Sequence, residues 1–209
     1  MATTQGPNPG LDTPHQMLLT DAAIMQADYA KDLVFQNQPA GGFFFRSGIV
    51  DILTSAICIG IRYYFILEAG VLKVILLGVE SQNSDITDII IGNAQTDPPY
   101  GNNDSITSLN QVISLEDAID LTAAFQTEYD KRSPGGFFDR SIFDYFIGVN
   151  DVIGIRYKFG INRNDELKLI INPVNSDFYD MDMFNVTGQK IRGEISDGGG
   201  GGGSPLVIS

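Results

Sequence analysis

The sequence is poor in the side chains most often used for catalysis and metal binding. Its 209 residues include one cysteine and one histidine. A single thiol excludes an intrachain disulfide and a cysteine-rich zinc site. Cys58 lies in an apolar stretch, which favours a buried inert thiol over a nucleophile. A catalytic triad or a histidine metal site would have to recruit His15, which follows a proline near the N-terminus. We therefore expect a protein that is not an enzyme and holds no cofactor.

Basic residues and long apolar runs are also scarce. The chain has 13 Lys and Arg against 26 Asp and Glu, a net charge of −13. An acidic surface repels phosphate backbones and anionic lipids, so we expect neither nucleic acid nor membrane as a partner. The most apolar stretch, 49–61, is shorter than the roughly 20 residues of a spanning helix. No basic region followed by an apolar run marks a signal peptide at the N-terminus. These features predict a soluble protein, either cytoplasmic or part of an assembly made inside the cell.

The most informative feature that is present is an internal repeat. Residues 40–47 (AGGFFFRS) return as 134–141 (PGGFFDRS), and 60–65 (GIRYYF) return as 154–159 (GIRYKF). Two similar units usually pack around a pseudo-twofold axis. We predict an N-terminal arm over 1–18 and a linker over 93–113. The two copies, 19–92 and 114–184, are expected to pack as one domain, and 185–209 to form a strand and a glycine-rich tail.

Each copy has the pattern helix, Gly-Gly turn, short helix, strand, strand, acidic turn. Ser114 and Asp117 fit the N-terminal cap of a helix. The paired glycines predict a turn that stops the first helix of each copy. Alternating apolar residues then predict a hairpin in each copy. The fold class is therefore α+β, with one mainly antiparallel sheet. We expect the helices to cover the sheet face that bears Ile61, Tyr63, Phe65, Ile155, Tyr157 and Phe159.

Four basic residues fall on the strand face opposite this apolar row. Arg62 and Arg156 occupy matching positions, and so do Lys73 and Lys168 on the return strands. Four cations on one face would bind a small acidic ligand or peptide. The alternative is that each forms a cross-strand pair with an Asp or Glu.

Acidic residues gather after each hairpin. Asp177, Asp180 and Asp182 are candidate ligands for calcium or magnesium, which would suit a metal-dependent hydrolase. Their spacing does not follow the calcium-binding loop pattern, and acidic caps and turns are the favoured alternative.

The C-terminus ends in an apolar segment on a flexible tether. Six glycines, 198–203, precede Leu206, Val207 and Ile208. Such a β-prone strip is suited to adding to the edge of a neighbouring subunit's sheet, the alternative being a frayed tail. Our leading hypothesis is a non-catalytic structural or interaction protein that self-associates into a homo-oligomer or larger assembly, with its terminal arms docking on neighbouring subunits. A binding module for an acidic ligand comes second, and a metal-dependent hydrolase third.

Overall fold

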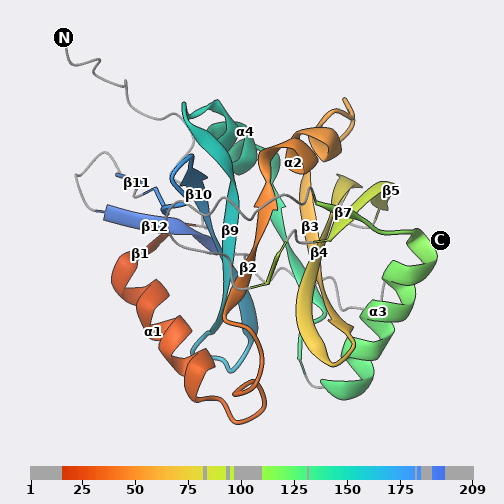
Figure 1. Cartoon of the computed structure of the whole chain (residues 1–209), viewed down its shortest axis with the longest axis vertical. Coiled ribbons are helices and arrows are strands. Elements are labelled where there is room, and N and C mark those ends of the chain that lie inside the picture. Colours follow the sequence, from red (N-terminus) through yellow and green to blue (C-terminus); the bar gives the residue numbers. More distant parts are fainter. Residues whose placement is uncertain are drawn as a thin grey trace.

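A computed structural model describes residues 16–81, 84–92, 95–96, 110–130, 132–181, 183–184 and 190–195. The described residues form four helices and two antiparallel sheets (Figure 1), which confirms the α+β class. The prediction of a single sheet is wrong. The physical cause is that both faces of each hairpin are buried. On the face predicted to be solvated, Tyr64 and Ile66 are buried in the first hairpin, and Arg156, Lys168 and Ile170 are buried in the second. Each hairpin therefore needs one cover from the other hairpin and another from a helix.

The helices begin close to where the sequence predicts them. Ser114 caps the third helix, since its Oγ accepts a hydrogen bond from the Asp117 N–H at 3.1 Å. Asp139 caps the fourth by accepting from the Ser141 N–H at 2.9 Å. The helices are α1 (Leu19–Lys31), α2 (Arg46–Leu53), α3 (Leu115–Glu128) and α4 (Arg140–Gly148).

In the described ranges, the larger sheet has seven strands and the smaller has five. Along the larger sheet the order is β1 (Gln16–Leu18), β12 (Lys190–Ile195), β10 (Leu167–Asn175), β9 (Val152–Ile161), β2 (Gly41–Phe45) and β6 (Gln95–Thr96), with β11 (Met183–Phe184) paired to β12. Along the smaller sheet it is β7 (Gln111–Val112), β5 (Ser84–Gly92), β4 (Val71–Ser81), β3 (Gly60–Glu68) and β8 (Gly135–Asp139). The predicted hairpins are β3–β4 and β9–β10, and the strand expected after the second copy is β12.

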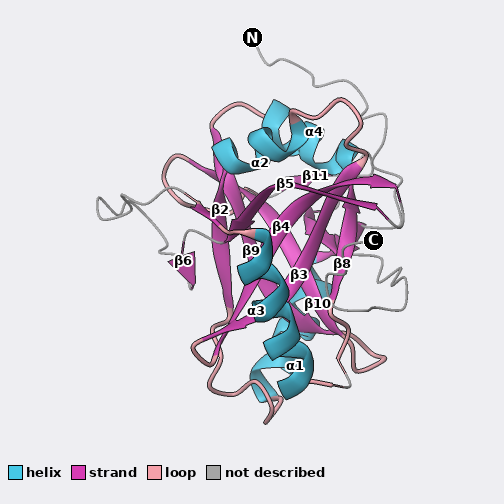
Figure 2. Ribbon diagram, turned by 90° about the vertical axis from the view of Figure 1, so that its right-hand side faces the viewer, coloured by secondary structure: helices cyan, strands magenta, loops and turns pink. Residues whose placement is uncertain are grey.

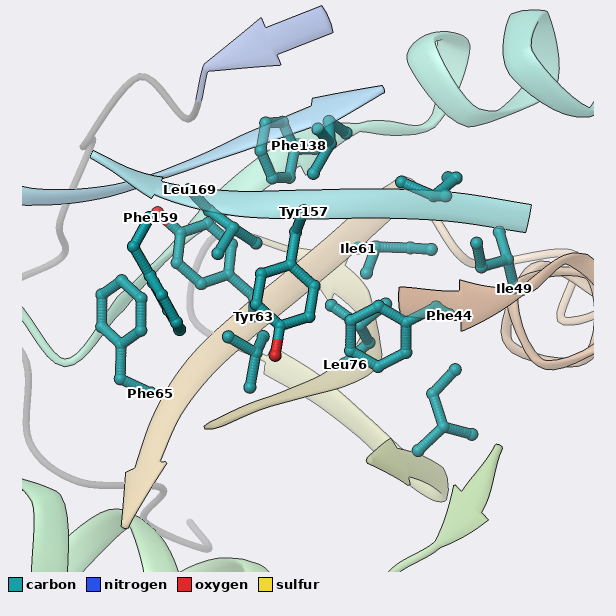
Figure 3. Close-up of a cluster of buried hydrophobic side chains, with 14 of the residues drawn as sticks. Phe44, Ile49, Ile61, Tyr63, Phe65, Leu76, Phe138, Tyr157, Phe159 and Leu169 are labelled. Atoms are coloured by element: carbon teal, nitrogen blue, oxygen red, sulfur yellow. The ribbon is translucent and has the colours of Figure 1, made fainter. Parts of the chain in front are cut away.

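The main core lies between the two sheets and contains the predicted apolar row of both hairpins (Figure 3). Phe65 and Phe159 meet there with ring centroids 5.9 Å apart. The helices cover other surfaces than predicted. Ala118 of α3 packs with Tyr64 on the outer face of the smaller sheet. Met25 of α1 packs on the outer face of the larger one. Figures 1 and 2 show α2 and α4 together at one end of the molecule.

The repeated Gly-Gly-Phe-Phe segment is a strand in both places, β2 and β8, and not the interhelical turn that its glycines suggest. The turn prediction relied on the conformational freedom of glycine. The structure uses glycine for a different reason, the close approach of a neighbouring strand.

Candidate functional site

The strands β2 and β8 each pair with a strand of the other predicted copy. β2 lies antiparallel to β9, with Gly42 opposite Tyr157 and Phe44 opposite Ile155. β8 lies antiparallel to β3 in the matching register. Each predicted copy therefore donates one strand to the sheet that holds the hairpin of the other. We call these two pairings the exchange junction.

Hydrogen bonds and glycines at the exchange junction occur in matching pairs. The Phe159 N–H donates to the Ala40 carbonyl at 3.0 Å, and the Phe65 N–H donates to the Pro134 carbonyl at 2.9 Å. A Cβ atom at Gly41 would overlap the carbonyl oxygen of Tyr157, and one at Gly135 would overlap that of Tyr63. Only glycine permits this approach of the two backbones.

Aromatic rings fill the space beneath the exchange junction. Phe44 lies 5.5 Å from Tyr157 and Phe138 lies 5.6 Å from Tyr63, measured between ring centroids. Tyr157 is fully buried, and this loss of solvent raises the pKa of its hydroxyl well above the usual value. A neutral, apolar interior of this kind suits packing and offers no acid–base chemistry at neutral pH.

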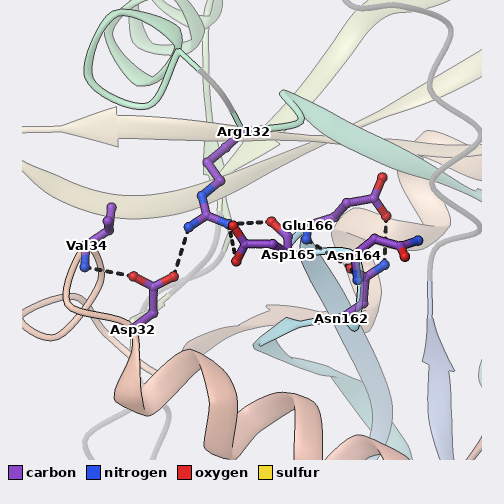
Figure 4. Close-up of polar contacts among 7 residues, drawn as sticks. All are labelled: Asp32, Val34, Arg132, Asn162, Asn164, Asp165 and Glu166. Atoms are coloured by element: carbon purple, nitrogen blue, oxygen red, sulfur yellow. Dashed lines mark hydrogen bonds and ion pairs between the residues drawn. The ribbon is translucent and has the colours of Figure 1, made fainter.

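Arg132 joins the two predicted copies by polar contacts near the ends of α1 and α3 (Figure 4). Its guanidinium lies 2.9 Å from the Asp32 carboxylate and 3.1 Å from the Asp165 carboxylate. It also lies 5.5 Å from the centroid of the Phe35 ring. The Asp32 carboxylate in turn accepts from the Val34 N–H at 2.8 Å, which orders the loop after α1.

The four basic residues predicted to bind a ligand lie on two different sheets. Arg62 and Lys73 belong to the smaller sheet, and Arg156 and Lys168 to the larger one. A single face with four cations is therefore not formed. Each of the four contacts an acid of its own chain, and the pairs are Arg62–Asp85, Lys73–Glu68, Arg156–Asp180 and Lys168–Glu166. An acidic ligand would have to compete with these carboxylates, and its binding stays a prediction.

The Arg156–Asp180 pair is almost completely enclosed. Arg156 is 1% exposed, and its guanidinium also donates to the Phe178 carbonyl at 2.9 Å. The second carboxylate oxygen of Asp180 accepts from Lys158 Nζ at 2.9 Å and from Asn172 Nδ2 at 3.2 Å. A buried ion pair of this kind is held by hydrogen bonds on both oxygens of the carboxylate.

A similar but more open cluster lies on the smaller sheet. Asp85 pairs with Arg62 and accepts from the Tyr64 hydroxyl at 2.7 Å. Burial, and then the adjacent Asp85 carboxylate, raise the pKa of Tyr64. Asp85 and Asp180 have the same role in the two sheets, because Asp85 lies opposite Val79 on β4 and Asp180 lies opposite Val174 on β10.

The predicted metal ligands do not form a cluster among the described residues. Asp177 belongs to a turn in which its N–H donates to the Asn175 side chain at 3.1 Å. Asp180 is engaged by Arg156, and Asp182 lies outside the described residues. Within the described ranges, no three His, Cys, Asp or Glu side chains are placed to share a metal ion.

Several further predictions fall outside the part of the chain that the structure describes. These are His15 and the apolar C-terminal residues Leu206, Val207 and Ile208. None of the helices in the described ranges is long and apolar enough to cross a membrane.

The exchange junction is the feature that sequence reasoning missed. Its signal was present in the double glycine, which in a strand often marks the close approach of another backbone. Comparisons of the chain with protein-family models, with curated proteins and with solved structures found no match.

Proposed function

We propose that this protein is a non-catalytic structural or interaction protein that assembles with copies of itself by adding β-strands across subunit boundaries. The exchange junction is the observation that carries the proposal. The body of the molecule is itself joined by strand addition, because β2 and β8 complete sheets that their own copies do not provide. Strand addition uses main-chain hydrogen bonds for affinity, and it needs no catalytic group.

We further infer that residues 19–92 and 114–184 arose by duplication and are related by a pseudo-twofold axis. Support comes from contacts that recur at matching positions. β1 precedes α1 and pairs with β12, while β7 precedes α3 and pairs with β5. The ion pairs Arg62–Asp85 and Arg156–Asp180 recur in the same way. A chain built as a fused pseudo-dimer already has complementary surfaces for a copy of itself.

The chemistry of the described surface agrees with this function. The basic strand residues are engaged by acids of the same chain. Several large apolar residues are exposed, among them Leu33 at 78% and Ile57 at 55%. Exposed apolar residues and strand edges are the usual material of protein–protein contacts.

Sedimentation velocity of the purified chain, from micromolar to near-millimolar concentration, tests the proposal. We expect the weight-average sedimentation coefficient to rise with concentration. Deletion of residues 204–209 should reduce that rise. A chain that sediments as a strict monomer over the whole range would overturn the proposal.

A further inference from the structure

The two exchanged strands differ at their second edge, the one that faces away from the junction. Two backbone hydrogen bonds at the ends of β8 show which of its residues face β3. The Phe65 N–H donates to the Pro134 carbonyl, and the Arg140 N–H donates to the Ile59 carbonyl. Antiparallel strands alternate residues that bond the partner with residues that face away. Gly136 and Phe138 therefore bond β3, and the N–H and C=O of Phe137 face outward. We call this side of β8 its outer edge.

The corresponding edge of β2 is covered. Phe43 there lies opposite Gln95 of β6. The Phe45 N–H donates to Asn110 Oδ1 at 2.9 Å, and the Phe45 carbonyl accepts from Asn110 Nδ2 at 3.1 Å. Phe43 itself is 1% exposed and lies 5.9 Å from Phe178 between ring centroids. The outer edge of β2 is thus closed by the short strand β6, by the side-chain amide of Asn110 and by the ring of Phe178.

Among the described residues, the outer edge of β8 has none of these covers. β8 is the last of the described strands on its side of the smaller sheet, and no residue in the described ranges bonds the backbone of Phe137 there. Gly135, Gly136 and Phe137 are half-buried, whereas the first four residues of β2 are buried. Figure 2 shows β6 near β2 on one side of the molecule and β8 on the other. An unpaired edge beside a half-exposed phenylalanine is a template for an added strand.

The sequence that follows β12 points to the segment that binds this edge. Gly92 of β5 lies opposite Ile75, and Ile195 of β12 lies opposite Ile170. Ile75 and Ile170 occupy matching positions in the two hairpins. The segment that matches β6 therefore falls in the glycine run 198–203. Glycine has no side chain to cover Phe137 and loses the most entropy on ordering, so it makes a poor strand.

The first β-prone residues after the glycine run are Leu206, Val207 and Ile208. Ten residues, 196–205, separate Ile195 from Leu206, whereas two residues, 93–94, suffice between β5 and β6. Ten extended residues span about 33–36 Å. That maximum reach exceeds what two residues bridge between β5 and β6, so the tether is long enough for its apolar end to contact a neighbouring molecule.

We propose that the outer edge of β8 binds the segment Leu206–Val207–Ile208 of a second copy of this chain as an added strand. Main-chain hydrogen bonds to Phe137 would hold it, and its aliphatic side chains would cover the Phe137 ring. This assignment rests on the proposed function and names the contact through which the copies join.

Photo-crosslinking of the full-length chain tests the assignment. The variant Phe137→p-benzoylphenylalanine keeps an aromatic ring at the outer edge. The matched control is Val112→p-benzoylphenylalanine, on the opposite edge strand of the same sheet, where Val112 is 77% exposed. We expect irradiation of the first variant to give a covalent dimer whose cross-linked peptide contains Leu206–Ile208. The control should give at least tenfold less dimer. Adding Val207→Pro to the Phe137 variant should remove most of that variant's cross-linked dimer, because proline cannot donate to a strand ladder.

Each other outcome overturns the assignment, and sedimentation shows whether the proposed function falls with it. Oligomers in sedimentation without the Phe137 cross-link would leave self-association standing and reject this edge. A cross-link from position 137 to residues 206–208 within one chain would show that the tail covers its own β8. A strict monomer without any cross-link would reject both proposals.

Discussion

The substitution Asp180→Asn should destabilise the protein far more than the matched substitution Asp85→Asn. Asparagine keeps the shape of the carboxylate and removes its charge. At position 180 this removes the negative charge that contacts both the guanidinium of Arg156, 1% exposed, and the ammonium of Lys158. Removing one partner of a buried ion pair typically costs about 3–5 kcal/mol. We expect a loss of this size for Asp180→Asn.

At position 85 the surroundings are more open. The side chains of Arg62 and Asp85 are 19% and 15% exposed, so water can solvate the arginine when its partner is neutral. We expect a loss of about 1–2 kcal/mol there, between the values for exposed and buried pairs. The two Arg–Asp pairs have the same residue types at matching positions, so the difference between the variants reports the enclosure of Arg156 together with the second cation, Lys158.

Urea unfolding followed by far-ultraviolet circular dichroism measures both losses. For a chain of this length each 1 kcal/mol corresponds to about 2–4 °C in melting temperature, which gives an independent check. Adding Arg156→Met to Asp180→Asn removes the buried guanidinium charge and should recover much of the loss. If Asp180→Asn costs no more than Asp85→Asn, enclosure does not govern the strength of this pair and the reasoning is refuted.

Two further predictions concern the exchange junction and one turn. Gly41→Ala places a methyl group against the Tyr157 carbonyl and should lower the free energy of unfolding, measured with urea, by more than about 3 kcal/mol. The control Gly148→Ala, whose methyl group meets nothing within 4 Å, should change it by less than about 1 kcal/mol. Equal effects of the two substitutions would contradict the close-approach argument. The pKa of Glu166 is lowered below its usual 4.5, first by the hydrogen bond from Asn162 and then by the hydrogen bond and charge of Lys168, so the charged form of Glu166 stabilises the fold. Glu166→Gln should therefore lower the free energy of unfolding at pH 7 by less than about 1 kcal/mol, and this loss should vanish as the pH falls through the lowered pKa. A loss of stability that persists at pH 2 would contradict this prediction.

The local structure of this chain was largely predictable from its sequence. The helix that begins after Ser114 follows from a cap that acts within a few residues. The hairpins follow from alternating residues such as Ile61 and Tyr63, both of which the structure buries between the sheets. These signals act over short stretches of chain, so a single sequence contains them in full.

Long-range pairing was not predictable in the same way. The strand β2 lies opposite β9, more than a hundred residues later, and no local signal selects that partner over β3. The number of sheets was missed because Tyr64 and Ile66 were treated as a solvated face, although both are apolar enough to be buried. The matching of Asp85 to Asp180 was obscured by the different lengths of chain between the hairpin and the acid.

The differences between the two predicted copies now carry more functional information than their similarities. Where they match, as at Gly41 and Gly135, one steric requirement explains both residues. Where they differ, packing alone gives no reason for the difference. The edge of β2 is closed by Gln95 and Asn110, while that of β8 leaves Phe137 half-buried, and the chain that would close it is replaced by glycine. A fold that needed both edges closed for stability would have a covering strand in both places. The described strands close the edge of β2 and leave that of β8 unpaired, and the sequence places an apolar segment after a glycine run at the matching point, which argues that the edge of β8 is used between molecules.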